Sequence, residues 1–452
     1  MEKIVLVNPA YDYPVLKNVK FYYLNKIWPP ISLAICATLL EKENFEVRII
    51  DANADRLTPE QVAEQVRGFD KIFVTSSSLD RWQCPHPDIR FFLKYVKKIR
   101  EKNPRKDIFV IGAHGTIRPK EILRLTKATA VIRGEPEPTI VEICKNKNLT
   151  RIKGLTFKKG KKIFSTPERA SSSLDNLPMP SYHLLPLGKY FYEFLGKNFM
   201  LFEGSRGCPF NCIYCLKKMY GPYRKKSPRN LIREVEYAIK NFGIKTAYFI
   251  DLEFTVNKKL VEDLCDYLIK KNYDFTWCCQ ARFDTIDMKL LLKMKKAGCR
   301  LIHFGVESGS ERILKLINKK ITLEEIENGM KIAKKAGIGV ACFFIFGLPT
   351  ETVEDMKKTI DISMKINPDY ASFHIAIPYP GTVFHNMVKK DLDSILFPFS
   401  YTGIYSEKQL KKIINYAYKK FYFRPSYFIS RLLSGDYELL LRQFKLFLAH
   451  IS

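Results

Sequence analysis

The sequence predicts an α/β protein with a doubly wound, Rossmann-like N-terminal domain, a partial (β/α)6 barrel of the TIM type and a helical C-terminal region. Short apolar segments rich in β-branched residues alternate with helical patterns over residues 1–145, and the same alternation returns over 199–385. The stretch 146–198 between them carries a hairpin pattern and a cluster of Ser and Pro, typical of a connection between domains. Residues 386–452 form the fourth part.

Composition indicates a protein of a reducing cytosol. The chain has 452 residues and 11 cysteines but no pattern of a disulfide framework, no N-terminal signal segment and no apolar run long enough to span a bilayer. The formal charge of +28 would suit a nucleic acid, an anionic membrane or an anionic substrate. Because the lysines are scattered along helices, solvated helix faces explain this charge at least as well.

In the N-terminal domain, five apolar segments are predicted to be parallel strands. They cover residues 3–7, 47–51, 71–75, 108–112 and 130–133. Helical patterns between them cover 31–41, 59–67, 88–101 and 119–126.

Small or polar residues stand where these strands end, which is the edge at which open α/β sheets bind ligands. The candidate binding residues are Asn8, Ser76, Ser77, Gly112, His114, Gly134 and Glu135. Short side chains at this edge leave room for a large planar ligand.

The second alternating region predicts six strands of a partial barrel, with chemistry at their carboxyl ends. The strands are expected at 199–203, 246–250, 275–280, 301–306, 339–346 and 370–377. The helices are expected at 228–241, 257–271, 287–296, 322–336 and 351–366, the last with Thr352 as its N-cap.

Three cysteines, Cys208, Cys212 and Cys215, follow the first barrel strand at CxxxCxxC spacing. Three thiolates this close can hold three irons of a [4Fe–4S] cluster and leave the fourth iron open for another ligand. A four-cysteine site would need a nearby fourth thiol, and the next cysteine is Cys265. The alternative is a chance group of buried cysteines.

This motif, with Tyr214 before its last cysteine, resembles the signature of radical S-adenosylmethionine (SAM) enzymes. The resemblance implies that the open iron binds SAM and that one-electron reduction yields a 5′-deoxyadenosyl radical. It also implies a set of SAM-binding residues at the strand ends: Tyr214, Asp251, Glu253, Arg282, Glu307, Ser308, Gly347 and Pro349.

Two of these assignments leave alternatives open. The family has an acidic pair or Gly-Gly-Glu after its second strand, whereas this chain has Leu252 between Asp251 and Glu253, so either carboxylate can face SAM. Each can also be a surface charge at a strand end, and Arg282 can be a structural ion-pair residue. The sequence identifies no catalytic acid or base.

The N-terminal domain resembles the cobalamin-binding domain that precedes many radical SAM modules. Matching pieces include Asn8-Pro9, Gly112-Ala113-His114 and Arg133-Gly134-Glu135. The Asp-x-His-x-x-Gly motif, whose histidine ligates cobalt in other cobalamin proteins, is absent, so His114 can simply belong to a loop. The alternative is a Rossmann-like domain that binds nothing or binds a substrate.

The C-terminal region is aromatic and basic, with helices expected after Ser406 and Pro425. Its run from Lys419 to Tyr427 resembles a tail element of members that act on hydrophobic substrates. Such a helix can lie on an anionic membrane surface, which would make the protein membrane-peripheral, or it can cover the open barrel as a lid.

Together these resemblances imply a cobalamin-dependent radical SAM C-methyltransferase that acts on an unactivated carbon of a small-molecule or lipid-like substrate. Its cofactors would be a [4Fe–4S] cluster, SAM and cobalamin, with an external one-electron reductant as partner. The alternatives are a radical SAM cyclase, carbon–carbon coupling enzyme or rearrangement enzyme, and a non-enzymatic iron–sulfur or RNA-binding protein. No aromatic pattern of an RNA-binding module supports binding to nucleic acid.

Overall fold

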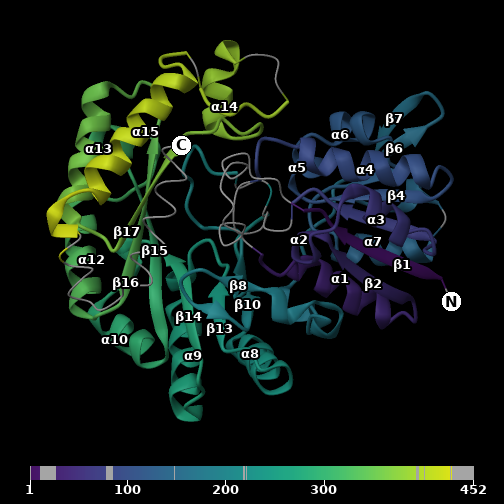
Figure 1. Cartoon of the computed structure of the whole chain (residues 1–452), viewed down its shortest axis with the longest axis horizontal. Helices are drawn as coiled ribbons and strands as arrows, with labels where there is room; N and C mark the ends of the chain where they lie inside the picture. The colour runs from purple at the N-terminus through teal and green to yellow at the C-terminus, as the bar shows by residue number, and fades with distance from the viewer. Residues whose placement is uncertain are drawn as a thin grey trace.

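The computed structural model describes residues 2–10, 27–77, 85–146, 148–216, 219, 221–392, 396–401, 403–427 and 429. Two α/β units lie side by side, and their strands form two separate sheets (Figure 1). None of the helices in these ranges is both long and apolar enough to cross a membrane.

The first sheet has the strand order β2-β1-β3-β4-β5-β6-β7, in which the first five strands run parallel. Its strands are β1 (Lys3–Asn8), β2 (Glu46–Asp51), β3 (Lys71–Thr75), β4 (Asp107–Ile111), β5 (Ala130–Ile132), β6 (Leu155–Lys159) and β7 (Lys162–Ser165). The five parallel strands confirm the predicted doubly wound domain.

Helices cover both faces of this sheet, because its strands are apolar on both sides. The helices are α1 (Ile31–Glu41), α2 (Ala52–Asp55), α3 (Pro59–Gln65), α4 (Arg90–Lys102), α5 (Ala113–Ile117), α6 (Pro119–Thr126) and α7 (Glu137–Lys145). Helices α1 and α7 pack together on one face, and α3, α4 and α6 line the other.

The hairpin pattern of the linker is confirmed, and it becomes part of the first sheet. β6 pairs antiparallel with β5 through Leu155 and Phe157, both buried, and β7 closes the edge. Apolar side chains two residues apart let β6 continue the core face of the sheet. The linker therefore completes the N-terminal unit rather than only connecting it.

The second sheet has the order β10-β13-β14-β15-β16-β17 and is parallel throughout. Its strands are β10 (Phe199–Phe202), β13 (Thr246–Phe249), β14 (Thr276–Ala281), β15 (Cys299–Glu307), β16 (Gly339–Phe346) and β17 (Tyr370–Ile375). Two short hairpins flank it: β8 (Phe191–Tyr192) with β9 (Gly196–Lys197), and β11 (Ser205–Arg206) with β12 (Arg224–Lys225). The predicted six-stranded partial barrel is confirmed.

Helices line the outside of the partial barrel, and α14 (Val383–Val388) lies apart from this layer (Figure 1). The helices of the layer are α8 (Pro228–Phe242), α9 (Lys258–Lys271), α10 (Met288–Lys296), α11 (Glu311–Leu316), α12 (Leu323–Lys335), α13 (Val353–Ile366) and α15 (Glu407–Tyr422). Thr352 caps α13 in a reciprocal capping box with Asp355, as predicted, and Ser406 caps α15 with Gln409 in the same way. The second tail helix, expected after Pro425, lies outside the described residues.

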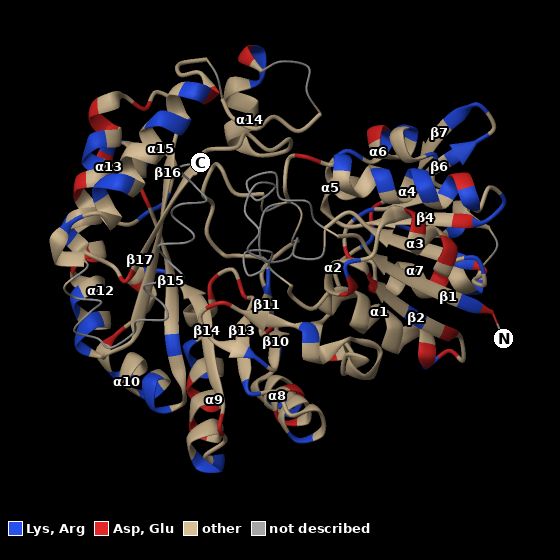
Figure 2. Ribbon diagram, in the orientation of Figure 1, with Lys and Arg blue, Asp and Glu red and all other residues tan. Residues whose placement is uncertain are grey.

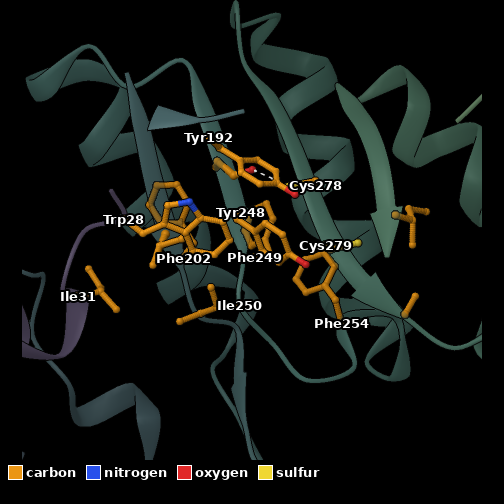
Figure 3. Close-up of a cluster of buried hydrophobic side chains, with 14 of the residues drawn as sticks. Trp28, Ile31, Tyr192, Phe202, Tyr248, Phe249, Ile250, Phe254, Cys278 and Cys279 are labelled. Atoms are coloured by element: carbon orange, nitrogen blue, oxygen red, sulfur yellow. Dashed lines mark hydrogen bonds between the residues drawn. The ribbon is translucent and has the colours of Figure 1, made fainter. Parts of the chain in front are cut away.

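One hydrophobic cluster runs through both units. Figure 3 shows Trp28, from the segment before α1, packed among aromatic side chains of the barrel. Its ring lies 5.1 Å from that of Tyr192 and 5.4 Å from those of Phe199 and Tyr248. The N-terminal unit thus supplies part of the barrel's own core.

Charged residues lie mainly on outward helix faces, and the strands are largely uncharged (Figure 2). Lysines and arginines are distributed over the helices of both units and do not gather on one face in this view. The scattered arrangement supports the interpretation of the net charge as solvated helix faces.

Candidate active site

The cysteine loop lies at the carboxyl ends of the barrel strands. Cys208, Cys212 and Cys215 are free thiols of intermediate exposure, whereas every other described cysteine is buried. Exposed thiols are the ones available to bind a metal, and buried ones behave as small core residues. This difference separates the three predicted cluster ligands from the rest.

Backbone hydrogen bonds fix the loop against two neighbouring segments. The Ile213 amide donates to the carbonyl of Ile317 at 3.1 Å, and the side-chain amide of Asn318 donates to the carbonyl of Asn211 at 2.8 Å. From the other side, the Phe384 amide at the start of α14 donates to the carbonyl of Ile213 at 3.0 Å. The loop is therefore positioned by the barrel before any ligand binds.

The donor set, three partly exposed thiols on one loop, is of the kind that holds an iron–sulfur cluster. Within the described ranges, no group of three or more His, Cys, Asp or Glu side chains is close enough together to hold one ion. Three separated, partly exposed thiols suit a larger inorganic group that each thiol can reach. Burial raises the pKa of Cys208 to about 11, so the thiolate form needs a metal to stabilise it.

Glu307 points into the site from an unusual backbone. The register of β15 against β16 shifts between Gly305 and Glu307, and Glu307 has a left-handed φ of 68°. A bulge of this kind redirects a side chain, and a non-glycine residue at positive φ stores strain that is common at functional sites. A Cβ on Gly305 would lie 2.2 Å from Glu307 Oε1, so the missing side chain makes room for this carboxylate.

Lys319 is the main site residue that the sequence analysis missed. Its ammonium is 4% exposed and donates to Glu307 Oε1 at 2.9 Å. Burial alone would lower the pKa of Lys319, but Glu307, Cys212 and Glu253 raise it above its ordinary value, so it stays charged. In the sequence Lys319 stands in an Asn-Lys-Lys run that is typical of a surface turn, which gives no signal of burial.

Glu253 is the stronger candidate of the two acids after β13. Its Oε2 atom is buried and has no hydrogen-bond partner among the described residues. Burial raises the pKa of Glu253 to about 8, although Lys319 and Arg282 oppose this shift. An unpartnered buried carboxylate oxygen is the feature that an incoming ammonium group would satisfy.

Asp251 is already engaged by the protein. Its two oxygens accept hydrogen bonds from the Gly204 amide at 2.8 Å and the Ser205 hydroxyl at 2.6 Å. Burial raises its pKa to about 7, against these two donors. Asp251 therefore fixes the chain where β10 leads into the cysteine loop, whereas Glu253 Oε2 has no such donor among the described residues.

Arg282 clamps the cysteine loop. Its guanidinium forms a bidentate pair with Asp284 at 2.8 Å and donates to the carbonyl of Lys320 at 3.1 Å. It also lies 3.9 Å from the ring centroid of Phe210, inside the loop. The structure favours the alternative in which Arg282 is an ion-pair residue, and it adds a cation–π contact that positions the loop.

Tyr214 and Ser308 are two further predicted SAM-binding residues close to Glu307. Burial together with the Glu307 carboxylate raises the pKa of Tyr214 well above its ordinary value, so its phenol stays protonated. Ser308 is fully buried, with its hydroxyl 3.2 Å from that of Thr359. Ser308 therefore connects the strand end to α13.

Gly347 and Pro349, two of the predicted SAM-binding residues, lie in a loop whose shape is set by Glu351, a residue that the sequence analysis did not single out. Glu351 Oε2 accepts hydrogen bonds from the Gly347 amide at 2.6 Å and the Leu348 amide at 3.1 Å. Pro349 is buried in the same turn. Glu351 thus fixes the backbone conformation of this loop.

A partly enclosed cavity lies at the carboxyl edge of the first sheet, and its empty space of about 610 Å³ includes the open solvent at its mouth. Most lining side chains are small; the lining residues are Pro30, Ser32, Leu33, Thr75, Ser77, Ile111, Gly112, Ala113, Thr116, Gly134, Glu135, Pro136, Arg206 and Met219. Of the predicted cobalamin-binding residues, Ser77, Gly112, Gly134 and Glu135 line this cavity. Arg206 and Met219 come from the cysteine loop region, so the cavity adjoins both units.

Asn8, Ser76 and His114 lie outside this lining. The side-chain amide of Asn8 donates to Asp51 at 2.8 Å, and Ser76 is fully buried. His114 Nε2 lies 2.8 Å from the carbonyl of His86, and burial lowers its pKa to about 4. His114 therefore belongs to a buried loop contact, which is the alternative that the sequence left open for it.

Arg206 links the cavity to the cysteine loop. Its guanidinium donates to Glu203 at 2.9 Å and to Glu137 at 2.8 Å, and it lies 3.3 Å from Glu135. Glu135 also pairs with Arg224 on β12. All three partners of Arg206 are acidic and come from both units, so this ion-pair network joins the end of β10 to the start of α7.

Comparison with known proteins agrees with this geometry. A family model described as the radical SAM superfamily matches residues 202–362, and one described as a B12-binding domain matches residues 23–144. An uncharacterised methyltransferase of Pyrococcus horikoshii is 34% identical, and the alignment covers 94% of each chain. The anaerobic magnesium-protoporphyrin IX monomethyl ester cyclase of Rubrivivax gelatinosus is 27% identical, over 78% of this chain and 65% of its own length.

Two solved structures share the fold. The radical SAM methyltransferase TsrM of Kitasatospora setae, solved with cobalamin and a [4Fe–4S] cluster, has a TM-score of 0.68 at 16% identity, over 86% of this chain and 75% of its own. The cobalamin-dependent SAM radical enzyme OxsB, solved with aqua-cobalamin and SAM, has a TM-score of 0.71 at 19% identity, over 92% of this chain and 66% of its own. At these identities the likeness concerns the fold.

Proposed function

Because the chain belongs to the radical SAM superfamily and carries a B12-binding domain, we propose that it is a cobalamin-dependent methyltransferase acting on an unactivated carbon. The observation that carries this proposal is the position of the N-terminal cavity. Its lining includes Arg206 and Met219, which flank the cysteine motif in sequence. A cofactor in the cavity would therefore lie beside the cysteine loop, where both groups can serve one substrate.

The proposal assigns each group of residues a task. Cys208, Cys212 and Cys215 would hold a [4Fe–4S] cluster, and the small side chains of the cavity would hold cobalamin. When bound, the cluster and SAM supply a substrate radical, and cobalamin supplies the methyl group. The protein would bind and orient the cofactors and the substrate, and it would exclude water from the site.

Within the barrel, the charged residues would orient SAM. The free oxygen of Glu253 would accept a hydrogen bond from the SAM ammonium. The charged pair of Lys319 and Glu307 would present one cation and one anion to the polar groups of SAM. Tyr214 and Arg282 would keep Glu307 and the cysteine loop in place.

The relatives support this reaction class and leave one alternative. The Pyrococcus horikoshii relative is named a methyltransferase, whereas the Rubrivivax gelatinosus relative is named a cyclase. A cyclase would use the same radical without methyl transfer. We propose methyl transfer because the 34% identical relative matches this chain over nearly its whole length. The partners would be a small-molecule or lipid-like substrate and an external one-electron reductant.

Peripheral membrane association is a further part of the proposal. On α15, Leu410, Ala417 and Phe421 are buried, whereas Tyr416 is 55% exposed next to solvent-facing lysines. Because the buried face holds α15 onto the barrel, the exposed face is the one available to anionic lipid. Tyr416→Ser should weaken sedimentation of the protein with anionic vesicles, and unchanged sedimentation would refute this association.

The test of the proposed function is cofactor content and product formation in protein purified without oxygen from cells given hydroxocobalamin. The wild type should carry about four irons and about one cobalamin per chain, and should form 5′-deoxyadenosine and S-adenosylhomocysteine from SAM. Cys212→Ala should lose iron, whereas the control Cys265→Ala, at a buried thiol on α9, should keep it. Iron and 5′-deoxyadenosine without cobalamin would contradict methyl transfer and support the cyclase alternative.

A further inference from the structure

The inner face of the partial barrel is open on its β16–β17 side. On β16, Cys342, Phe344 and Phe346 are completely buried against the helices, whereas Phe343 and Ile345, which point the other way, are partly exposed. Adjacent side chains of a strand point to opposite faces. The partly exposed side chains therefore lie on the inner face of the barrel, whereas in a closed core they would be buried.

The same alternation continues on β17. Ala371 and Phe373 are 3% exposed and pack toward α15, whereas Ser372 is half-buried and His374 is exposed. On β14, Gln280 is also partly exposed and lies opposite His303 of β15 in the strand register. The partly exposed positions of three strands thus lie on one continuous surface.

Rings cross this surface from strand to strand. The ring of Tyr248 on β13 lies 5.3 Å from that of His303, which lies 5.5 Å from Phe343, which lies 5.7 Å from His374 on β17. The hydroxyl of Tyr192 lies 3.0 Å from His303 Nε2 and fixes the orientation of that ring. These spacings are those of aromatic pairs in contact, so the rings form one wall.

The open end of the wall carries polar side chains. His374 Nε2 lies 2.8 Å from the hydroxyl of Ser372, which lies 3.4 Å from the hydroxyl of Tyr418 on α15. Every residue of β14 to β17 is described. Among the side chains on the inner face of these strands, only that of Glu307 is an Asp, Glu, Lys or Arg, and Lys319 pairs with it. None of the five described residues that form the wall (Gln280, His303, Phe343, Ser372 and His374) is a Lys, Arg, Asp or Glu, so the wall offers no ammonium or guanidinium group to a phosphate and no carboxylate to an amine.

We propose that this wall, formed by Gln280, His303, Phe343, Ser372 and His374, binds a planar conjugated molecule that carries an uncharged polar group. The rings would contact the faces or edges of the conjugated system, and His374 would hydrogen-bond the polar group. A saturated lipid would bury as much area but would gain no ring contacts. That this molecule is the methyl acceptor rests on the proposed function, whereas its binding does not.

The test compares two probes with the same carbon skeleton and the same hydroxyl group. 2-Naphthol is planar and fluorescent, and decahydro-2-naphthol is saturated and more hydrophobic. Binding of 2-naphthol to the full-length protein is followed by its fluorescence, and decahydro-2-naphthol is added as competitor. The proposal expects 2-naphthol to bind roughly ten-fold more tightly. Equal or tighter binding of the saturated probe would overturn it.

Variants place the binding on the wall. Phe343→Leu removes a ring and leaves an apolar side chain, so it should weaken 2-naphthol binding roughly five-fold and leave decahydro-2-naphthol unaffected. His374→Leu also removes the hydrogen bond to the hydroxyl group, so it should weaken the binding of both probes, and that of 2-naphthol more. Phe164→Leu is the matched control, because Phe164 is 43% exposed on β7 of the other unit. Equal loss in the control, or no loss in either wall variant, would overturn the proposal.

Thermal unfolding of each variant shows whether it is folded. If Phe343→Leu does not fold, Gln280→Leu, at another partly exposed position of the wall, replaces it with the same two probes. Failure of the proposed function is seen separately, in the iron content and SAM cleavage of the wild type. A wild type without these cofactors would still bind 2-naphthol on the wall.

Discussion

The ammonium of Lys319 donates a 2.9 Å hydrogen bond to the carboxylate of Glu307 inside the barrel, where both residues are almost fully buried. A glycine at position 305 leaves the space that this pair occupies. The turn that carries Lys319 inward has left-handed φ at Asn318 and Lys320, and Asn318 also holds the cysteine loop. The pair is therefore built into the same turn that positions the cysteines.

Removing one member of this pair should destabilise the protein strongly. Lys319→Met leaves Glu307 buried without its cation, and we expect the free energy of unfolding to fall by about 3 kcal/mol. The double variant Lys319→Met with Glu307→Gln should recover much of this loss, because no charge is left unpaired. Urea unfolding of the two single variants and the double variant checks this, and additive losses would contradict it.

Gly305→Ala should affect SAM binding more than stability. A Cβ there would lie 2.2 Å from Glu307 Oε1 and 2.8 Å from Lys319 Nζ, both at the ends of flexible side chains. These ends can move, so the free energy of unfolding should fall by only about 1 kcal/mol. The displaced pair would no longer contact SAM. The shift in Tm caused by SAM should shrink. Gly68→Ala is the control, because a Cβ there meets nothing within 4 Å.

Arg206→Gln should loosen the junction between the cavity and the cysteine loop. The substitution leaves Glu203, Glu137 and Glu135 without their shared cation. The free energy of unfolding should fall by about 3 kcal/mol. Cobalamin retained on gel filtration and iron content should both fall. Arg224→Gln, which removes the outer partner of Glu135 alone, should have a smaller effect on each. Loss of cobalamin with normal iron would show that the network does not reach the loop.

The buried carboxyl of Asp51 should make stability depend on pH. Burial raises its pKa from 3.8 to about 6, so the folded protein favours the protonated form. The stabilisation is full below the unfolded pKa and is lost as the pH rises through about 6, a change of about 3 kcal/mol. Asp51→Asn cannot ionise and should lose this part of the pH dependence.

Urea unfolding of the wild type and Asp51→Asn at several pH values measures that difference. Between about pH 4 and pH 7, the free energy of unfolding of Asp51→Asn should rise relative to that of the wild type. Asp361→Asn, at an exposed carboxylate on α13, is the control for the substitution itself. Parallel curves for Asp51→Asn and the wild type would contradict the prediction.

The elements that sequence reasoning predicted are those whose signal is local. Strand β16 is an uninterrupted apolar run, and α13 begins with Thr352 and Asp355 at capping-box spacing. The cysteine spacing is equally local. The place of the hairpin formed by β6 and β7 was not predicted, because the edge with which a strand pairs depends on the rest of the fold.

Roles that depend on distant partners were harder to predict. Asp251 and Glu253 are equivalent in the sequence, and only the contacts of Asp251 with Gly204 and Ser205 separate them. Lys319 looks like a solvated lysine until the fold brings Glu307 to it. For these buried charges, the partner decides the role, and the fold rather than the local sequence brings the partner into contact.

The position of Trp28 bears on how the two units unfold. Its indole belongs to the N-terminal segment by sequence and to the barrel by packing, and one apolar cluster extends across both units. An isolated barrel would lose this ring and expose the surface that it covers. The two units should therefore unfold in a single cooperative transition, and an exchange of units between relatives would have to move Trp28 together with the barrel.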